Sequence, residues 1–407
     1  MLLALPLLAS LTALPAADGK FHAYFFDVGH GDATLLVSPV GRSVLIDAGP
    51  QAAGNHLRLR IPQLVKDELD LVVLTHAADE HQGALEELIH GLGARRFLDP
   101  GLRDQGAGHE ALIQRLQQQG VQIVLPIPDP EAPAELLRID MGGGVELEVL
   151  WPRAPVETLL PSGRKLQANS IVLRAVYGET SLLLMGDAQP ETEEYLLKRR
   201  YALQSTLLKV SDHGAAASST LPFLVGARPL AGIISVGPGN ASGAPARSVL
   251  QRLQQVGVKV FRTDLDGEVQ AVSDGKRFTV VTERLTAGEA ATLSWSFPLA
   301  PLGAAVSRVA AARPGKVMRL DDLAAAHSPP PVKQGPAQNR PGRVEIKSTA
   351  ASSEDGVIAL RVAKKGEKYF HFADCPAAAK IPPGQRVVFT SRAEAMKRFK
   401  PASDCQP

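Results

Sequence analysis

Five short apolar runs in this chain each end in a turn that carries aspartate, histidine or glycine. Runs of this length and composition are typical of buried strands, and the turns place chemically active side chains at the strand ends. The five runs are FFDVGHGD at 25–32, SVLIDAG at 43–49, LTHAADEHQGA at 74–84, LLLMGDA at 182–188 and LLKVSDHG at 207–214.

The strand-like runs alternate with amphipathic stretches that have helical spacing. GALEELIHGLG at 83–93 follows the strand-like run 69–76, and SVLQRLQQVG at 248–257 precedes the strand-like run 258–263. Strands separated by helices favour an α/β sandwich, in which two sheets pack face to face and helices cover them outside. We expect this domain over residues 20–285.

The composition is that of a globular protein with one large domain and a smaller one. The chain has 407 residues, of which 45% are hydrophobic and 21% are charged. A net charge of +2 gives no global basic field that would favour nucleic acid, but from Lys364 onward nine Lys or Arg face four Asp or Glu. The basic charge is therefore concentrated in the last part of the chain.

Residues 1–17 are uncharged, rich in leucine and alanine, and end in small residues before Asp18. This pattern is typical of a signal peptide and predicts a periplasmic or secreted protein. The run is shorter than the ~20 apolar residues that a membrane span requires. The alternatives are an incorrectly assigned start and an apolar N-terminal strand.

The strand pattern ends near Arg284. Residues 286–343 are rich in proline and alanine, which predicts a partly extended linker. A compact α+β module is expected over residues 344–407.

The five motifs, in this order, resemble the metallo-β-lactamase superfamily, and most closely the soluble hydrolase domain of ComEC competence proteins, over residues 20–284. The resemblance implies an αββα sandwich and a metal-dependent hydrolase. It does not extend to the membrane channel of full-length ComEC proteins.

The family's signature loop, HxHxDH, aligns here with His76, Ala78, Glu80 and His81. The two histidines match, alanine cannot bind a metal, and glutamate replaces the family's aspartate. Asp79 is an alternative carboxylate ligand beside Glu80. The resemblance therefore implies a metal site that has lost one of its ligands.

The later motifs supply the remaining candidates. Asp187 matches the family's bridging aspartate, and His213 matches one member of its His-His-Gly motif, while Asp212 occupies the other position. Ala244 stands where relatives carry a further histidine. The resemblance implies catalytic roles for His76 and Asp187. The implied metal ligands are His76, Glu80, His81, Asp187 and His213, with Asp79 and Asp212 as alternates.

These ligands favour one ion over two, with zinc preferred and manganese as the alternative. Mixed nitrogen and oxygen ligands of this kind suit a Lewis-acidic ion. Asp32 and Asp47 are interpreted as fold elements, and His30 as a surface or loop histidine.

The C-terminal module resembles an Ada-type zinc-binding module, but Ala402 replaces one of its cysteines. Cys375 and Cys405, the two cysteines of the chain, either form a disulfide, which we favour, or bind zinc with His371 and Asp374 or Asp404. The basic residues of the module suggest binding of nucleic acid.

Three functional hypotheses follow. The first is an exported phosphodiesterase or nuclease that acts on extracellular nucleic acid through a metal-activated water. The second is a binding or scaffold protein that retains the fold without catalysis. The third is a phosphorylcholine esterase-like enzyme that acts on the cell envelope.

Overall fold

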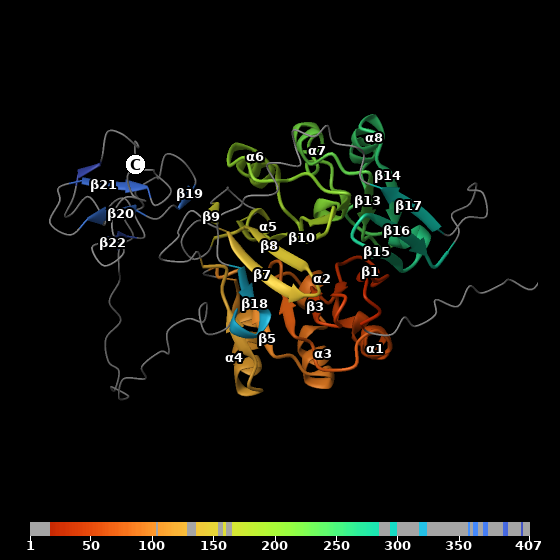
Figure 1. Ribbon diagram of the computed structural model, residues 1–407, viewed down its shortest axis with the longest axis horizontal. Coiled ribbons are helices and arrows are strands. Elements are labelled where there is room, and N and C mark those ends of the chain that lie inside the picture. The colour runs from red at the N-terminus through yellow and green to blue at the C-terminus, as the bar shows by residue number, and fades with distance from the viewer. Residues whose placement is uncertain are drawn as a thin grey trace, which may run out of the picture.

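The computed structural model shows two large β-sheets packed face to face, with helices on both outer faces (Figure 1). The described residues are 17–102, 105–127, 136–153, 158–159, 165–284, 294–298, 317–323, 357–358, 361–364, 369–372, 386–389 and 400–401. The αββα sandwich expected from the sequence is confirmed.

The first sheet has nine strands among the described residues, in the order β17-β16-β15-β1-β2-β3-β4-β5-β6. Strands β3 to β6 run parallel, and the other pairs are antiparallel. Their bounds are β1 (Phe21–Phe25), β2 (Thr34–Val37), β3 (Ser43–Ile46), β4 (Leu71–Val73), β5 (Arg96–Leu98), β6 (Gln122–Val124), β15 (Val269–Ser273), β16 (Arg277–Thr282) and β17 (Ser294–Pro298).

The second sheet has eight strands in the described part of the chain, in the order β14-β13-β12-β11-β10-β8-β7-β18. Strands β11 to β14 run parallel, β18 is parallel to β7, and the remaining pairs are antiparallel. Their bounds are β7 (Leu137–Gly142), β8 (Val145–Trp151), β10 (Val172–Tyr177), β11 (Thr180–Leu184), β12 (Leu207–Lys209), β13 (Ala231–Ile234), β14 (Lys259–Arg262) and β18 (Val317–Arg319).

Helices cover each sheet on its outer side (Figure 1). The first sheet is covered by α1 (Gly54–Arg60), α3 (Leu85–Leu92) and α4 (Ala107–Gln118), and the second by α6 (Pro190–Lys198), α7 (Leu221–Ala227) and α8 (Arg247–Gln255). Helix α3 buries Leu85, Leu88 and Ile89, whose spacing places them on one helical face. Shorter helices are α2 (Asp79–Gln82), α5 (Lys165–Ala168), α9 (Thr263–Asp266), η1 (Gln51–Ala53), η2 (Ile61–Gln63), η3 (Ser211–Gly214) and η4 (Leu320–Asp322).

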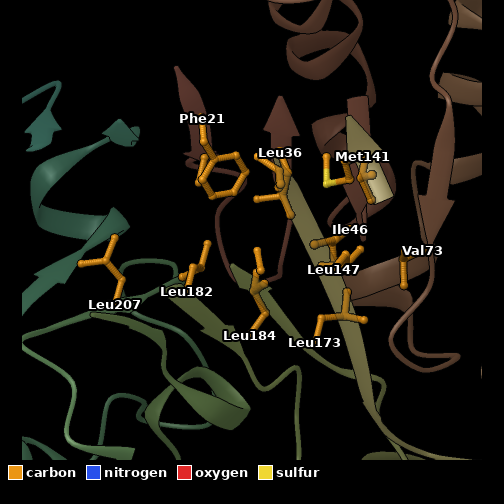
Figure 2. Close-up of a cluster of buried hydrophobic side chains, with 14 of the residues drawn as sticks. Phe21, Leu36, Ile46, Val73, Met141, Leu147, Leu173, Leu182, Leu184 and Leu207 are labelled. Carbon is orange, nitrogen blue, oxygen red and sulfur yellow. The ribbon is translucent and has the colours of Figure 1, made fainter. Parts of the chain in front are cut away.

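Strand pleating divides the apolar residues between three cores. Phe21 and Phe25 of β1 point between the sheets, whereas Tyr24 packs under the helices of the first sheet. Leu182 and Leu184 of β11 likewise face the central core, and Leu183 faces α6 and α7. Figure 2 shows leucines of the second sheet lying opposite Phe21 and Leu36 of the first. Burial on both faces explains why these strands are almost continuously apolar.

Two stretches of the segment expected to be a linker form strands at the sheet edges. Trp295 of β17 packs edge-on against Phe261 of β14, with the ring centroids 4.9 Å apart. The stretch after β18 buries Leu320 and Leu323 in the central core. Asp321 accepts hydrogen bonds from Arg42 and, through its backbone oxygen, from Arg96. Residues 317–323 therefore contact both sheets.

The described residues of the C-terminal part include a four-stranded sheet in the order β22-β20-β21-β23. Its strands are β20 (Arg361–Lys364), β21 (Tyr369–Phe372), β22 (Arg386–Phe389) and β23 (Lys400–Pro401), and a separate pair joins β9 (Thr158–Leu159) to β19 (Val357–Ile358). Cys375, Cys405 and residues 1–16 of the predicted signal peptide lie outside the described residues. The disulfide and the signal peptide therefore stay predictions.

Candidate metal centre

Side chains from both sheets meet where the strands β1, β3, β4, β11 and β12 end. His76 follows β4, His81 lies on α2, Asp187 follows β11, and His213 lies on η3 after β12. All four are buried, with side-chain exposures of 0–4%. Three separate sequence motifs thus converge at one edge of the sandwich.

The central cluster contains His76, His81 and Asp187. The Nε2 atoms of His76 and His81 lie 3.6 Å and 3.5 Å from Oδ2 of Asp187. The two imidazole centroids are 4.2 Å apart. One ligand atom from each residue lies within 4.8 Å of the others, a spacing that suits a single bound cation.

His213 approaches the same carboxylate from the other side. Its Nε2 lies 3.8 Å from Oδ1 of Asp187, and its ring centroid lies 5.5 Å from that of His81. Asp32, Asp187 and His213 form a second group that could hold a metal. Asp187 belongs to both groups, so its two oxygens face different sets of ligands.

The atoms that point into the cluster have no hydrogen-bond partner among the described residues. They are Nε2 of His76, His81 and His213, and Oδ1 of Asp187. A buried polar atom without a partner is costly, and several together at one point are rare in folded proteins. Three imidazole nitrogens and a carboxylate oxygen are suitable ligands for zinc, so the residues fit a metal ion.

Hydrogen bonds to the opposite ring nitrogens orient the imidazoles. Nδ1 of His81 lies 2.8 Å from Oδ2 of Asp47, and Nδ1 of His213 lies 2.9 Å from the backbone oxygen of Ser235. Nδ1 of His76 lies 3.2 Å from Oγ of Ser170. Contacts at Nδ1 direct each Nε2 into the cluster, as is usual for histidines that bind metals.

Asp47 is itself held by the strand end. The backbone N–H and the hydroxyl of Thr75 both donate to its carboxylate, at 2.8 Å and 2.7 Å. The neighbouring Gly186 has φ of 51°, and a Cβ at this position would lie 3.1 Å from Cβ atoms of Thr75 and Ser170. Glycine therefore allows Asp187 to approach the first sheet.

Burial and neighbouring charges shift the pKa values of the cluster. Burial, reinforced by the neighbouring His81, lowers the pKa of His76 to about 3. Burial also opposes charge on His81, but the carboxylates of Asp187 and Asp47 outweigh it and raise its pKa well above the usual value. The pKa of Asp187 is held well below its usual range because His81 and His213 outweigh its burial. An anionic Asp187 beside a neutral His76 suits a cation at this point.

The structure does not bring every candidate residue to the cluster. Glu80 is half-buried and Asp79 is exposed on α2, and neither belongs to the possible metal-binding groups of the described residues. Asp212 accepts a hydrogen bond from Gln189 at 3.0 Å, whereas its neighbour His213 faces the cluster. Both Asp212 and His213 have φ near 50°, and this turn separates the directions of the two side chains.

Sequence reasoning missed a buried ion pair beside the cluster. Nζ of Lys209 lies 2.7 Å and 2.9 Å from the two oxygens of Asp32, and both side chains are at most 6% exposed. Asp32 was interpreted as a fold element, yet it lies in two of the three possible metal-binding groups. Its place in a turn after a strand, which it shares with Asp187, was the available signal.

Parts of this chain are similar in sequence to known proteins. Residues 26–160 match the family model described as the metallo-beta-lactamase superfamily. ComE operon protein 3 of Bacillus subtilis (strain 168) is 28% identical over 275 residues, which cover 63% of this chain and 33% of that protein. Competence protein ComA of Neisseria gonorrhoeae is 29% identical over 249 residues, covering 60% of this chain and 31% of ComA.

Among solved structures, Tm1679, a metal-dependent hydrolase of the beta-lactamase superfamily, matches with 14% identity and a TM-score of 0.39. The match covers 60% of this chain and 95% of Tm1679. This chain spans about a third of the length of the curated relatives above. Within its described residues, no helix is long and apolar enough to cross a membrane. Residues 26–160 thus match the metallo-beta-lactamase superfamily model, and the chain is similar to parts of ComE operon protein 3 and of competence protein ComA.

Proposed function

We propose that this protein is an exported, metal-dependent phosphodiesterase that acts on extracellular nucleic acid. The superfamily consists generally of metal-dependent hydrolases. The observation that carries the proposal is the convergence of four buried, unpartnered atoms from His76, His81, Asp187 and His213. Homology to two competence proteins favours nucleic acid over other phosphodiesters.

Each residue has a defined role in this proposal. His76, His81 and Asp187 would hold the ion, and Asp187 would link it to His213 of the second sheet, which lies with Asp32 in the adjacent group. When bound, a zinc ion supplies Lewis acidity towards a phosphoryl oxygen and lowers the pKa of a coordinated water. The anionic Asp187 presents Oδ2 to His81 and Oδ1 to His213, so its carboxylate would also accept a hydrogen bond from a water at the site.

Glu80 is assigned a different place in the proposed site from the one that the motif alignment implied. Its half-buried side chain lies outside the possible metal-binding groups of the described residues. We therefore assign the ligand roles to the buried cluster and place Glu80 at its rim.

The experiment measures bound metal and phosphodiesterase activity together. The wild-type protein, His81→Ala, Asp187→Ala and the control His56→Ala are purified without a histidine tag, and zinc and manganese are counted by elemental analysis. His56 is an exposed residue of α1, so its replacement leaves the site intact. We expect about one zinc ion per chain in the wild type and the control, and loss of metal and of bis(p-nitrophenyl) phosphate hydrolysis in the other two.

A wild-type protein that binds neither zinc nor manganese would contradict the proposal. The absence of metal would then be explained by Ala78 and Ala244, which stand where relatives carry ligands. That outcome would favour the binding or scaffold protein.

Export and binding of nucleic acid are separate parts of the proposal. Sequencing the N-terminus of protein recovered from the periplasm or medium tests the first, with cleavage after Ala17 expected. The net charge of +5 from Lys364 to the C-terminus supports the second.

A further inference from the structure

The loop between β1 and β2 carries a histidine that the proposed mechanism does not use. His30 lies two residues before Asp32, and its side chain is half-buried. Its ring centroid is 4.6 Å from that of His213, with an angle of 48° between the ring planes. His30 is therefore a direct neighbour of the candidate metal centre.

One nitrogen of His30 has no partner. Its Nδ1 is buried and has no hydrogen-bond partner within the described part of the chain. The residue as a whole is only partly buried, so part of it is open to an incoming molecule. A buried unpaired nitrogen in a partly exposed residue is a group that a ligand can satisfy.

His30 is a neighbour of the metal cluster rather than a member of it. The three possible metal-binding groups among the described residues draw on His76, His81, His213 and three aspartates, and His30 is in none of them. Its expected partner is therefore a molecule held at the cluster.

The backbone around His30 is tightly enclosed. A side chain at Gly31 would collide with the backbone oxygen of Glu80, and one at Gly237 would collide with the backbone N of His30. Asp32 N–H also donates to the oxygen of Glu80 at 3.1 Å. The loop is thus fixed between the signature loop and the turn after β13, so little ordering is needed when a ligand binds.

We propose that His30 donates a hydrogen bond to a non-bridging phosphoryl oxygen of the substrate while that substrate occupies the metal centre. This inference rests on the proposed function and names a residue that binds the substrate. An imidazole carries an N–H donor in either protonation state, which suits an anionic oxygen. His30 would then contribute to holding the phosphoryl group at the site formed by His76, His81 and Asp187.

The test compares His30→Ala, His30→Gln and His56→Ala with the wild type, all loaded with zinc. Three quantities are measured: bound zinc, the affinity for inorganic phosphate by calorimetry, and KM and kcat for bis(p-nitrophenyl) phosphate. We expect unchanged zinc in all four proteins. We expect about tenfold weaker phosphate binding and a similar rise in KM for His30→Ala, as for loss of one hydrogen bond to a charged group.

His30→Gln should recover most of the affinity, because its amide is also an N–H donor. His56→Ala should behave as the wild type. If His30→Ala leaves both phosphate affinity and KM unchanged, the inference is wrong while the proposed function stands. If His30→Ala loses zinc, His30 is a metal ligand and the inference is again wrong. If the wild type binds no metal and no phosphate, the proposed function fails, and this inference fails with it.

Discussion

Nδ1 of His81 lies 2.8 Å from Oδ2 of Asp47, and this contact fixes which nitrogen of the imidazole faces the metal centre. Asp47 is fully buried and is held by both the N–H and the hydroxyl of Thr75. Residues that follow β3 and β4 thus hold the His81 ring in the orientation that a metal ligand needs.

We expect Asp47→Ala to weaken zinc binding by about 10–100-fold, the usual effect of removing a carboxylate that orients a metal-binding histidine. Competition with a chromogenic chelator measures the affinity. Asp47→Asn keeps an oxygen acceptor for His81 and should lose less. Equal affinity in Asp47→Ala and wild type would show that Asp47 does not orient His81.

Replacement of Lys209 tests the buried ion pair. We expect Lys209→Met to reduce the free energy of unfolding of the metal-free protein by about 3–5 kcal/mol, because it leaves the carboxylate of Asp32 buried without its cation. Urea unfolding measures this change. The double variant Asp32→Asn with Lys209→Met should be more stable than Lys209→Met alone; additive losses would contradict the coupling.

The pKa of His76, lowered to about 3 by burial and by His81, predicts an acid-dependent loss of stability in the metal-free protein. Between its unfolded value of 6.5 and about 3, the unfolded chain binds a proton here and the folded chain does not. The free energy of unfolding therefore falls as the pH is lowered through this window. Asp187, whose pKa is depressed, contributes stability that is present above its unfolded value of 3.8 and is lost below it.

The pKa of His81 is raised, so its contribution has the opposite sign. It is fully present below 6.5 and is lost as the pH rises through its folded value. We therefore expect greatest stability near pH 6.5 from these two histidines. Urea unfolding in a chelator from pH 4 to pH 8 measures this profile. His76→Gln should flatten only the acid side, and an unchanged acid slope would contradict the assignment.

The basic C-terminal residues predict salt-dependent binding of nucleic acid. We expect Lys397→Glu with Arg398→Glu to weaken binding of single-stranded DNA and to reduce the slope of log K against log salt, because fewer counterions are released. Fluorescence anisotropy at 50–200 mM salt measures both. The control variant Glu191→Lys with Glu194→Lys changes two charges on α6, outside the C-terminal part. It should not weaken DNA binding or reduce the salt slope.

The sequence was sufficient to predict the two-sheet sandwich and the residues that follow its buried strands. His76, Asp187 and His213 each follow an apolar run that marks a strand, and His81 lies on the short helix after His76, so their meeting at one edge follows from the fold. Glu80 shows the limit of this reasoning, because adjacent positions of the short helix α2 differ: His81 is buried in the cluster, whereas Glu80 is half-buried and belongs to none of the possible metal-binding groups of the described residues.

The Asp32–Lys209 pair was not predicted because the two residues are 177 positions apart and belong to different sheets. Neither motif alone indicates a salt bridge. The turn at His213 was not predicted either. Two consecutive residues with positive φ decide there which of Asp212 and His213 enters the cluster. Long-range pairing and unusual backbone angles are set by tertiary packing, which local patterns do not report.

The stretch from Val317 to Leu323 has a consequence for dividing this protein into fragments. It adds β18 to the edge of β7, buries Leu320 and Leu323, and joins the first sheet through Arg42 and Arg96. A fragment that stops at residue 285 would expose the backbone of β7 to pairing with other chains and open part of the central core. The smallest piece expected to keep this edge paired and the central core closed therefore extends beyond Leu323, well past the end of the recognisable motifs.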